Sequence, residues 1–219
     1  IREEFAVFLG DAMAFDAAVG LLFEQLKAID HWYKTLLLIA GDHGAPGFPR
    51  GKCNLYDFGT RVTLAMRLPS KIQAGVRIET PVSLVDLAPT LLNACGVEPA
   101  EPMDGESLLP AIARGSQTTS QREAKLRGWV LSGRENHVDE ARPGGLPYPM
   151  RSLRNRDYLY VINFAPNRWP VAKPPLSAPL TKSVSSKKGR SQRRMDLDFG
   201  PTRDFFVRYE GMPEIEQAW

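Results

Sequence analysis

The chain has 219 residues, of which 43% are hydrophobic and 24% are charged, which is typical of a folded domain rather than of a disordered or fibrous protein. No apolar run approaches the roughly 20 residues needed to cross a bilayer, and no targeting signal is visible. The net charge of +3 comes from one tract, Lys182–Arg194, without which 22 basic and 25 acidic residues remain. This distribution excludes a basic surface over the whole molecule.

Residues 2–29 predict a long helix, because apolar side chains recur every three or four positions and form one stripe. Since the chain opens directly in helical sequence, we expect it to be a piece of a longer protein. Residues 35–40 predict a buried strand of a parallel sheet, because a short apolar run ends abruptly at a glycine. A helix followed closely by a strand is half of a βαβ repeat.

Three further elements are expected before residue 114. The sequence predicts a strand over 61–68, a helix over 83–95 and a short helix over 107–113. Ser83 is the expected N-cap, close to a capping box with Asp86, and Gly96 fits the residue just past the helix. Pro89 is expected to kink this helix or to split it.

The polar segment 114–127 predicts a subdomain boundary, because strands without intervening helices follow it. Residues 129–132 predict one strand, and residues 150–153 with 158–164 predict a hairpin. The region from 167 to about 200 is rich in proline and then basic, which predicts a long exposed loop. The expected fold class is therefore α/β, with a sheet flanked by helices over 1–127 and a small antiparallel α+β subdomain over 128–219.

The stretch most indicative of function is 36–56, where an apolar run ends in Gly-Asp-His-Gly and a loop rich in glycine and proline leads to Lys52. Ligand sites of open α/β sheets lie just beyond such strand ends. Asp42 offers a hard oxygen and His43 a neutral nitrogen, a donor pair that suits Mg, Mn, Zn or Ca but that needs further ligands. A metal and a lysine together can bind a tetrahedral oxyanion, sulfate or phosphate. The alternative for Asp42 is a residue that ends the strand and caps a turn.

The two cysteines have neither metal-ligand spacing nor the pattern of a disulfide framework. Cys95 ends an apolar helical run and is expected to be a small buried hydrophobe. Cys53 is also expected to be structural, because no residue near it in the sequence resembles a base for a thiol nucleophile.

These motifs resemble the second half of a sulfatase of the alkaline-phosphatase superfamily. The resemblance is carried by residues 41–44, 51–62, 67–72, 82–92 and 103–110, in the right order. Residues 133–137, 148–152 and 163–170 resemble the heparan N-sulfatase, or sulfamidase, branch more narrowly. The resemblance implies the fold of an alkaline-phosphatase-like sheet and an activity on sulfated carbohydrate.

The same resemblance implies roles for single residues. Asp42 and His43 match two ligands of a divalent cation, usually Ca²⁺, although His43 stands where many sulfatases have Asn, so Mn or Zn is also open, as is Mg. Lys52 matches the residue that holds the sulfate, and His137 matches a histidine that contacts sugar or leaving group. The family's formylglycine, made within a Cys/Ser-x-Pro-x-Arg motif, and its pair of metal-binding Asp residues do not occur in this sequence. We therefore expect half an active site, inactive without the remainder of the sulfatase chain, and a periplasmic, extracellular or lysosomal location.

Three alternatives stay open. One is a phosphatase or phosphonate monoester hydrolase of the same superfamily, which an Asp-His metal pair would suit. Another is a non-catalytic module that binds polyanions through Lys182–Arg194, with nucleic acid disfavoured because the tract has no interleaved aromatic residues. The last is a purely structural homologue without catalysis.

Overall fold

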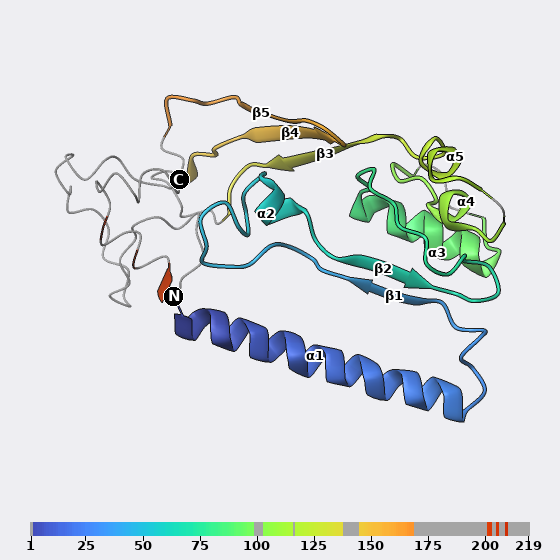
Figure 1. Cartoon of the computed structure of the whole chain (residues 1–219). Helices are drawn as coiled ribbons and strands as arrows, with labels where there is room; N and C mark the ends of the chain where they lie inside the picture. Colours follow the sequence, from blue (N-terminus) through green and yellow to red (C-terminus); the bar gives the residue numbers. More distant parts are fainter. Residues whose placement is uncertain are drawn as a thin grey trace.

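The computed structural model describes residues 2–98, 103–115, 117–137 and 145–168, with positions 201, 202, 205 and 209. Its elements are shown in Figure 1. They are the helices α1 (Arg2–Ala28), α2 (Asp57–Thr60), the 3₁₀ turn η1 (Leu84–Asp86), α3 (Leu87–Cys95), α4 (Leu109–Ile112) and α5 (Thr119–Glu123), and the strands β1 (Leu37–Ala40), β2 (Leu64–Arg67), β3 (Trp129–Arg134), β4 (Met150–Asn155) and β5 (Leu159–Asn163).

The strands form two separate sheets. In the first, β1 pairs with β2, with Leu37 opposite Arg67 and Ala40 opposite Leu64. In the second, β3, β4 and β5 lie in that order, and each neighbouring pair is antiparallel. Mixed helices and sheets with a small antiparallel sheet in the second half confirm the predicted fold class and the predicted hairpin.

The prediction of parallel pairing for residues 35–40 is wrong for the residues that the structure describes. The pairing seen there for β1 is antiparallel, to β2. The predicted burial is also wrong, because three residues of β1 are half-buried and Ala40 is exposed. A short apolar run that ends at a glycine favours a strand, but it carries no information about the direction of its neighbour or about what covers its faces. The limits of the two expected domains, 1–127 and 128–219, stay a prediction.

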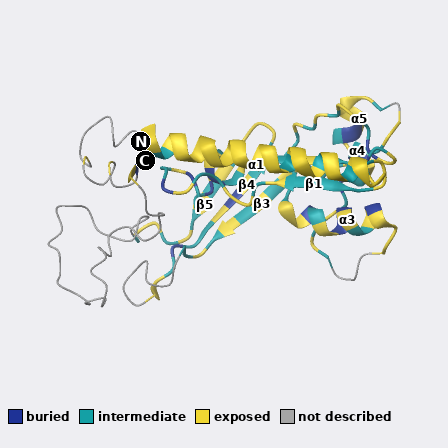
Figure 2. Cartoon of the chain, turned by 90° about the horizontal axis from the view of Figure 1, so that it is seen from below, coloured by how far each residue is buried: buried dark blue, intermediate teal, exposed yellow. Residues whose placement is uncertain are grey.

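Helix α1 confirms the predicted helix but does not bury the predicted stripe. None of its 27 residues is buried, and Figure 2 shows most of its surface exposed. Its recorded aromatic contacts lie toward its two ends, where Phe5 meets Phe48 with ring centroids 5.2 Å apart and Phe23 meets Trp32 at 5.1 Å. An apolar face is therefore left largely uncovered in this chain.

By length and composition α1 also qualifies as a helix that could cross a membrane, so the expectation that no such segment exists is wrong in that respect. The core helix of a soluble protein and a signal sequence qualify in the same way. This single helix is therefore weak evidence for a membrane span.

The buried core lies between the end of β2 and helices α3 and α4. Leu68, Ile72 and Ala94 form its centre, with Leu36, Met66, Leu109 and Ile112 packed against them. The capping box predicted at Ser83 is present: its hydroxyl accepts from the backbone of Val85, and Asp86 accepts from the backbone of Ser83. The predicted helix is split into η1 and α3, so Pro89 falls in the first turn of α3, where a missing N–H breaks no helical hydrogen bond.

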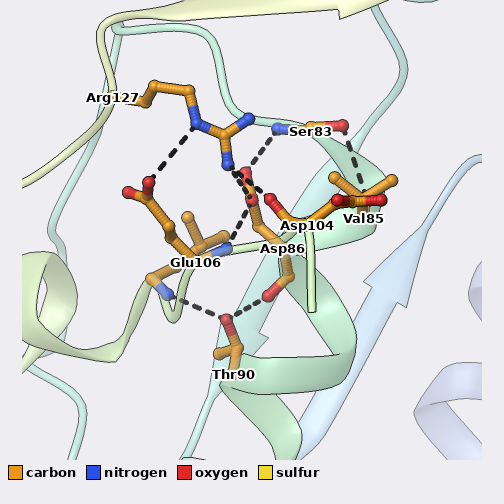
Figure 3. A network of polar contacts seen from close by, with 8 residues as sticks. Ser83, Val85, Asp86, Thr90, Asp104, Glu106 and Arg127 are labelled. Atoms are coloured by element: carbon orange, nitrogen blue, oxygen red, sulfur yellow. Dashed lines mark hydrogen bonds and ion pairs between the residues drawn. The ribbon is translucent and has the colours of Figure 1, made fainter. Parts of the chain in front are cut away.

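A buried polar network connects this core to the second sheet, as Figure 3 shows. Asp86 is 5% exposed, and its carboxylate accepts hydrogen bonds from the backbone of Ser83 and Glu106, both at 2.9 Å, and from Arg127 at 3.0 Å. The hydroxyl of Thr90 donates to the carbonyl of Asp86. Because Arg127 lies two residues before β3, this network ties the start of the second sheet to η1.

Two further links connect the second sheet and its β4–β5 turn to α2 and α5. Arg154 of β4 donates two hydrogen bonds, both 3.0 Å long, to the two carboxylate oxygens of Asp57 at the start of α2. Glu123 accepts from the backbone N–H of Glu79 at 3.0 Å and faces Arg156 at 3.5 Å. The hydrogen bond from Glu79 is the main cause that lowers the pKa of Glu123, against partial desolvation that raises it.

Two expectations fall outside the described residues. They are the exposed loop with the basic tract Lys182–Arg194, which lies within residues 169–200, and the short helix expected over 204–219, of which only positions 205 and 209 are described.

Candidate active site

The loop that follows β1 folds back onto itself through backbone hydrogen bonds. The N–H of Gly41 donates to Thr63 at 2.8 Å and extends the β1–β2 pairing, and the N–H of Gly44 donates to Gly59 at 3.0 Å. The N–H of Lys52 donates to the carbonyl of Ala45 at 3.1 Å. A Cβ on Gly44 would overlap the carbonyl oxygen of Phe58, so this close approach requires glycine. The loop thus fixes the backbone of Lys52 beside the Asp-His segment.

Asp42 and His43 face one another at the start of this loop. The ring Nδ1 of His43 lies 2.9 Å from the carbonyl oxygen of Gly44, and since that oxygen can only accept, Nδ1 carries the proton. The other nitrogen, Nε2, lies 3.2 Å from Oδ2 of Asp42. Both side chains reach solvent, with 37% of the His43 side chain and 86% of the Asp42 side chain exposed.

This geometry fits a cation site. The Nε2 lone pair and the carboxylate oxygen lie 3.2 Å apart and both reach solvent, so one cation could take both atoms as ligands. Among the residues that the structure describes, no three His, Cys, Asp or Glu side chains gather to complete such a site. The pair therefore offers two ligands and leaves the rest of the coordination to other groups.

His137 reaches the same loop from the other sheet. Its Nδ1 lies 2.5 Å from Sγ of Cys53, the residue after Lys52 and 84 positions away in the sequence. Arg134, the last residue of β3, donates to the carbonyl of Cys53 at 2.6 Å and lies 5.7 Å from the ring centre of the buried Tyr148. The structure thus brings together His137 and the Lys52 segment, two of the predicted positions.

Both predictions for the cysteines need correction. Cys53 does have a potential base beside it, namely His137, and the sequence could not show this because the contact is tertiary. Cys95 is exposed rather than buried, since the neighbouring Ala94 takes the position of α3 that faces the core. Arg134 lies within the motif 133–137 but was assigned no role from the sequence, because its contact with the Cys53 carbonyl is tertiary.

A separate groove of about 1530 Å³ runs between β2, the segment 72–84 and strands β3 and β4. Asp42 and the ion pair of Asp57 with Arg154 belong to its lining, whereas His43, Lys52 and His137 do not. The loop site and the groove therefore adjoin at Asp42.

Comparison with known proteins gives a consistent result. Residues 46–139 match the family described as N-sulphoglucosamine sulphohydrolase, C-terminal. The chain is 30% identical over 158 residues to the N-sulphoglucosamine sulphohydrolase of Homo sapiens, which covers 68% of this chain and 28% of that protein. It is 29% identical over 153 residues to an ulvan-active sulfatase of Formosa agariphila, which covers 70% of this chain and 23% of that protein.

A solved structure also matches: that of BT4656 in complex with its substrate D-glucosamine-2-N,6-O-disulfate. The TM-score is 0.53 and the sequence identity is 25%, over 68% of this chain and 29% of that one. In both fold and sequence, this chain is of the sulfatase class. More particularly, the chain corresponds to the C-terminal portion of a sulfatase, on the heparan N-sulfatase branch. It spans 23% and 28% of the length of the two curated relatives above.

Proposed function

We propose that the protein carrying this chain is a sulfatase that hydrolyses a sulfate ester or an N-sulfate of a sugar, and that the loop 41–56 supplies one side of its sulfate site. The observation that carries the proposal is the meeting of this loop with His137, 84 residues beyond Cys53. The relatives are sulfatases, and the matched solved structure holds a sulfated glucosamine, which supports a sulfated carbohydrate as substrate.

Each side chain has a distinct role in this proposal. The ammonium group of Lys52 is a compact cation that would hold an oxygen of the sulfate and stabilise the charge that develops there. Asp42 and His43 would be two ligands of a divalent cation, Ca²⁺ in the first place, with Mn, Mg or Zn as the other options; when bound, it would polarise the sulfate. His137 would contact the sugar or the leaving group from the side of β3.

The nucleophile would come from outside this chain, because no Cys/Ser-x-Pro-x-Arg motif occurs in its sequence. We propose a formylglycine in another part of the full-length protein. The same part would provide the remaining metal ligands, since two are too few for a tight site. On this proposal residues 1–219 alone are inactive.

The test compares substrates and variants of the full-length protein. N-sulfoglucosamine, an aryl sulfate and an aryl phosphate are offered in turn, and turnover of a sulfated substrate is the expected result. Lys52→Ala should lower kcat/KM by about 10²- to 10³-fold, as the loss of an oxyanion-binding group does. Lys34→Ala is the matched control, because Lys34 is an exposed lysine outside the loop.

Exclusive turnover of the aryl phosphate would overturn the proposal in favour of a phosphatase or phosphonate monoester hydrolase. An unchanged kcat/KM in Lys52→Ala would remove the assigned role of that lysine. Asp42→Asn adds a readout apart from activity: thermal stabilisation of the protein by added Ca²⁺ should need a higher concentration of the ion than in the wild type.

A further inference from the structure

Cys53 is the residue in the loop for which the proposed hydrolysis has no use, yet its surroundings are specific. Its thiol is half-buried and touches Nδ1 of His137, a group that can accept a proton. The guanidinium of Arg134 donates to the Cys53 carbonyl, which holds this part of the loop against the end of β3. A histidine in contact with a partly accessible thiol is a setting in which cysteines become nucleophilic.

The second cysteine provides a contrast within the same chain. Cys95 is exposed and is the last residue of α3, and among the described residues no histidine contacts its thiol. Exposure alone would make Cys95 the faster of the two to react. The surroundings of the two thiols give the opposite order.

We propose that Cys53 and His137 form a nucleophile–base pair and that Cys53 is the preferred site of covalent modification in this chain, by soft electrophiles and by disulfides. With an alkyl iodide, the thiol proton moves to His137, the sulfur forms a bond to carbon, and iodide leaves. With a disulfide, the same sulfur forms a mixed disulfide and displaces one thiolate of the reagent, so no further oxidant is needed.

Such an adduct would replace the contact with His137 and would sit one residue from Lys52. It would therefore alter the loop whether or not that loop binds sulfate. The inference is independent of the proposed function, because its readout is the labelling of a thiol and not turnover.

The test uses iodoacetamide, a neutral reagent whose approach does not depend on the charge of the surrounding side chains. The folded chain is labelled under pseudo-first-order conditions, and each cysteine is quantified by peptide mass spectrometry. Cys53 should react about tenfold faster than Cys95, because His137 can take up the thiol proton. His137→Asn should remove most of this difference, whereas His31→Asn, a change at an exposed histidine before β1, should leave it unchanged.

Two outcomes would overturn the proposal. One is labelling of Cys95 at an equal or higher rate in the folded wild type. The other is an unchanged Cys53 rate in His137→Asn while Cys95, as an internal check on the fold, keeps its own rate. If His137→Asn does not fold, the wild type is labelled in urea instead. Unfolding should then lower the ratio of the Cys53 rate to the Cys95 rate. An unchanged ratio in urea would contradict the Cys53–His137 pair.

Discussion

Asp86 and Glu106 both face the guanidinium of Arg127, but they differ in burial. The Asp86 side chain is 7% exposed and lies 3.0 Å from Arg127, while the Glu106 side chain is 66% exposed and lies 3.7 Å away. Asp86 also accepts two backbone hydrogen bonds from Ser83 and Glu106. Water screens the exposed pair, so stability should depend on Asp86 far more than on the Glu106 side chain.

Asp86→Asn should therefore lower the free energy of unfolding by about 2–4 kcal/mol, because an amide NH₂ would face backbone donors and leave Arg127 without its buried counter-charge. Glu106→Gln is the matched control, with an expected loss below about 0.5 kcal/mol. Urea denaturation of the two variants measures both values. Equal losses would mean that burial does not set the strength of these pairs.

Glu123 predicts a dependence of stability on pH. Its pKa is lowered from 4.5 in the folded state, chiefly by the hydrogen bond from the backbone of Glu79. A carboxylate whose pKa is lower in the folded state than in the unfolded state stabilises the fold. This stabilisation is fully present above the pKa of the unfolded state and is lost as the pH falls through the pKa of the folded state. Stability should therefore decline below about pH 4.5 less steeply in Glu123→Gln than in the wild type.

The measurement is the free energy of unfolding as a function of pH in both proteins. Glu24→Gln serves as control, since Glu24 pairs only with the exposed Lys27 on α1 among the contacts recorded for it. The same reduction in slope in both variants would show that the effect is not specific to Glu123.

Helix α3 depends on the residue that ends it. Gly96 has φ +72°, and its N–H closes the helix by donating to Asn93. A Cβ there would meet no atom within 4 Å, so the cost of a side chain is one of backbone conformation alone. A substitution at Gly96 therefore tests backbone strain without steric overlap. At Gly44, by contrast, a Cβ would overlap the carbonyl oxygen of Phe58.

Gly96→Ala should lower the free energy of unfolding by about 1 kcal/mol, the usual cost of the left-handed conformation for a residue with a Cβ. Gly20→Ala provides a control of opposite sign, because Gly20 lies in the interior of the exposed helix α1 with open space around it. That change should raise helicity in far-UV circular dichroism, since alanine favours the helix by about 1 kcal/mol over glycine. A neutral Gly96→Ala would mean that α3 ends differently in solution.

At the scale of the molecule, and within its described part, arginines between residues 127 and 156 connect the three-stranded sheet to loops and helices of the first half of the chain, Arg156 among them through Glu79. Arg127 reaches Asp86, Arg134 reaches the carbonyl of Cys53, and Arg154 reaches Asp57. Figure 1 shows the three-stranded sheet on one side of the β1–β2 pair and α1 on the other. The guanidinium groups donate several hydrogen bonds in fixed directions, so they hold the position of the second sheet and with it that of His137.

Asp57→Asn should weaken this connection. One of the two hydrogen bonds from Arg154 would be lost, because the amide NH₂ of Asn cannot accept, and the other would lose its charge. We expect a cost of about 1 kcal/mol for this partly exposed pair and faster exchange of the amide hydrogens of β4. Glu135→Gln is the matched control, because Glu135 pairs with the exposed Arg151 of the same sheet and does not bridge to the first sheet through that contact. Equal effects on exchange would argue against Asp57 as a link.

The sequence by itself determined the local features: the helix over α1, the capping box at Ser83, the glycine that ends α3, and the hairpin of β4 and β5. Each depends on neighbours within a few residues, so periodicity and cap chemistry contain the answer. The motifs around Asp42 and Lys52 also sufficed to indicate a sulfatase, with which the comparisons agree.

Only the tertiary structure decided the direction of pairing of β1, the exposure of α1 and Cys95, and the contact of His137 with Cys53. These depend on which surfaces meet after folding, and no local pattern records this for residues 84 positions apart. Burial likewise separates Asp86 from Glu106, two acids that look equivalent in the sequence. The residue types define what chemistry is available, and the packing of the two sheets defines which of those residues can act together.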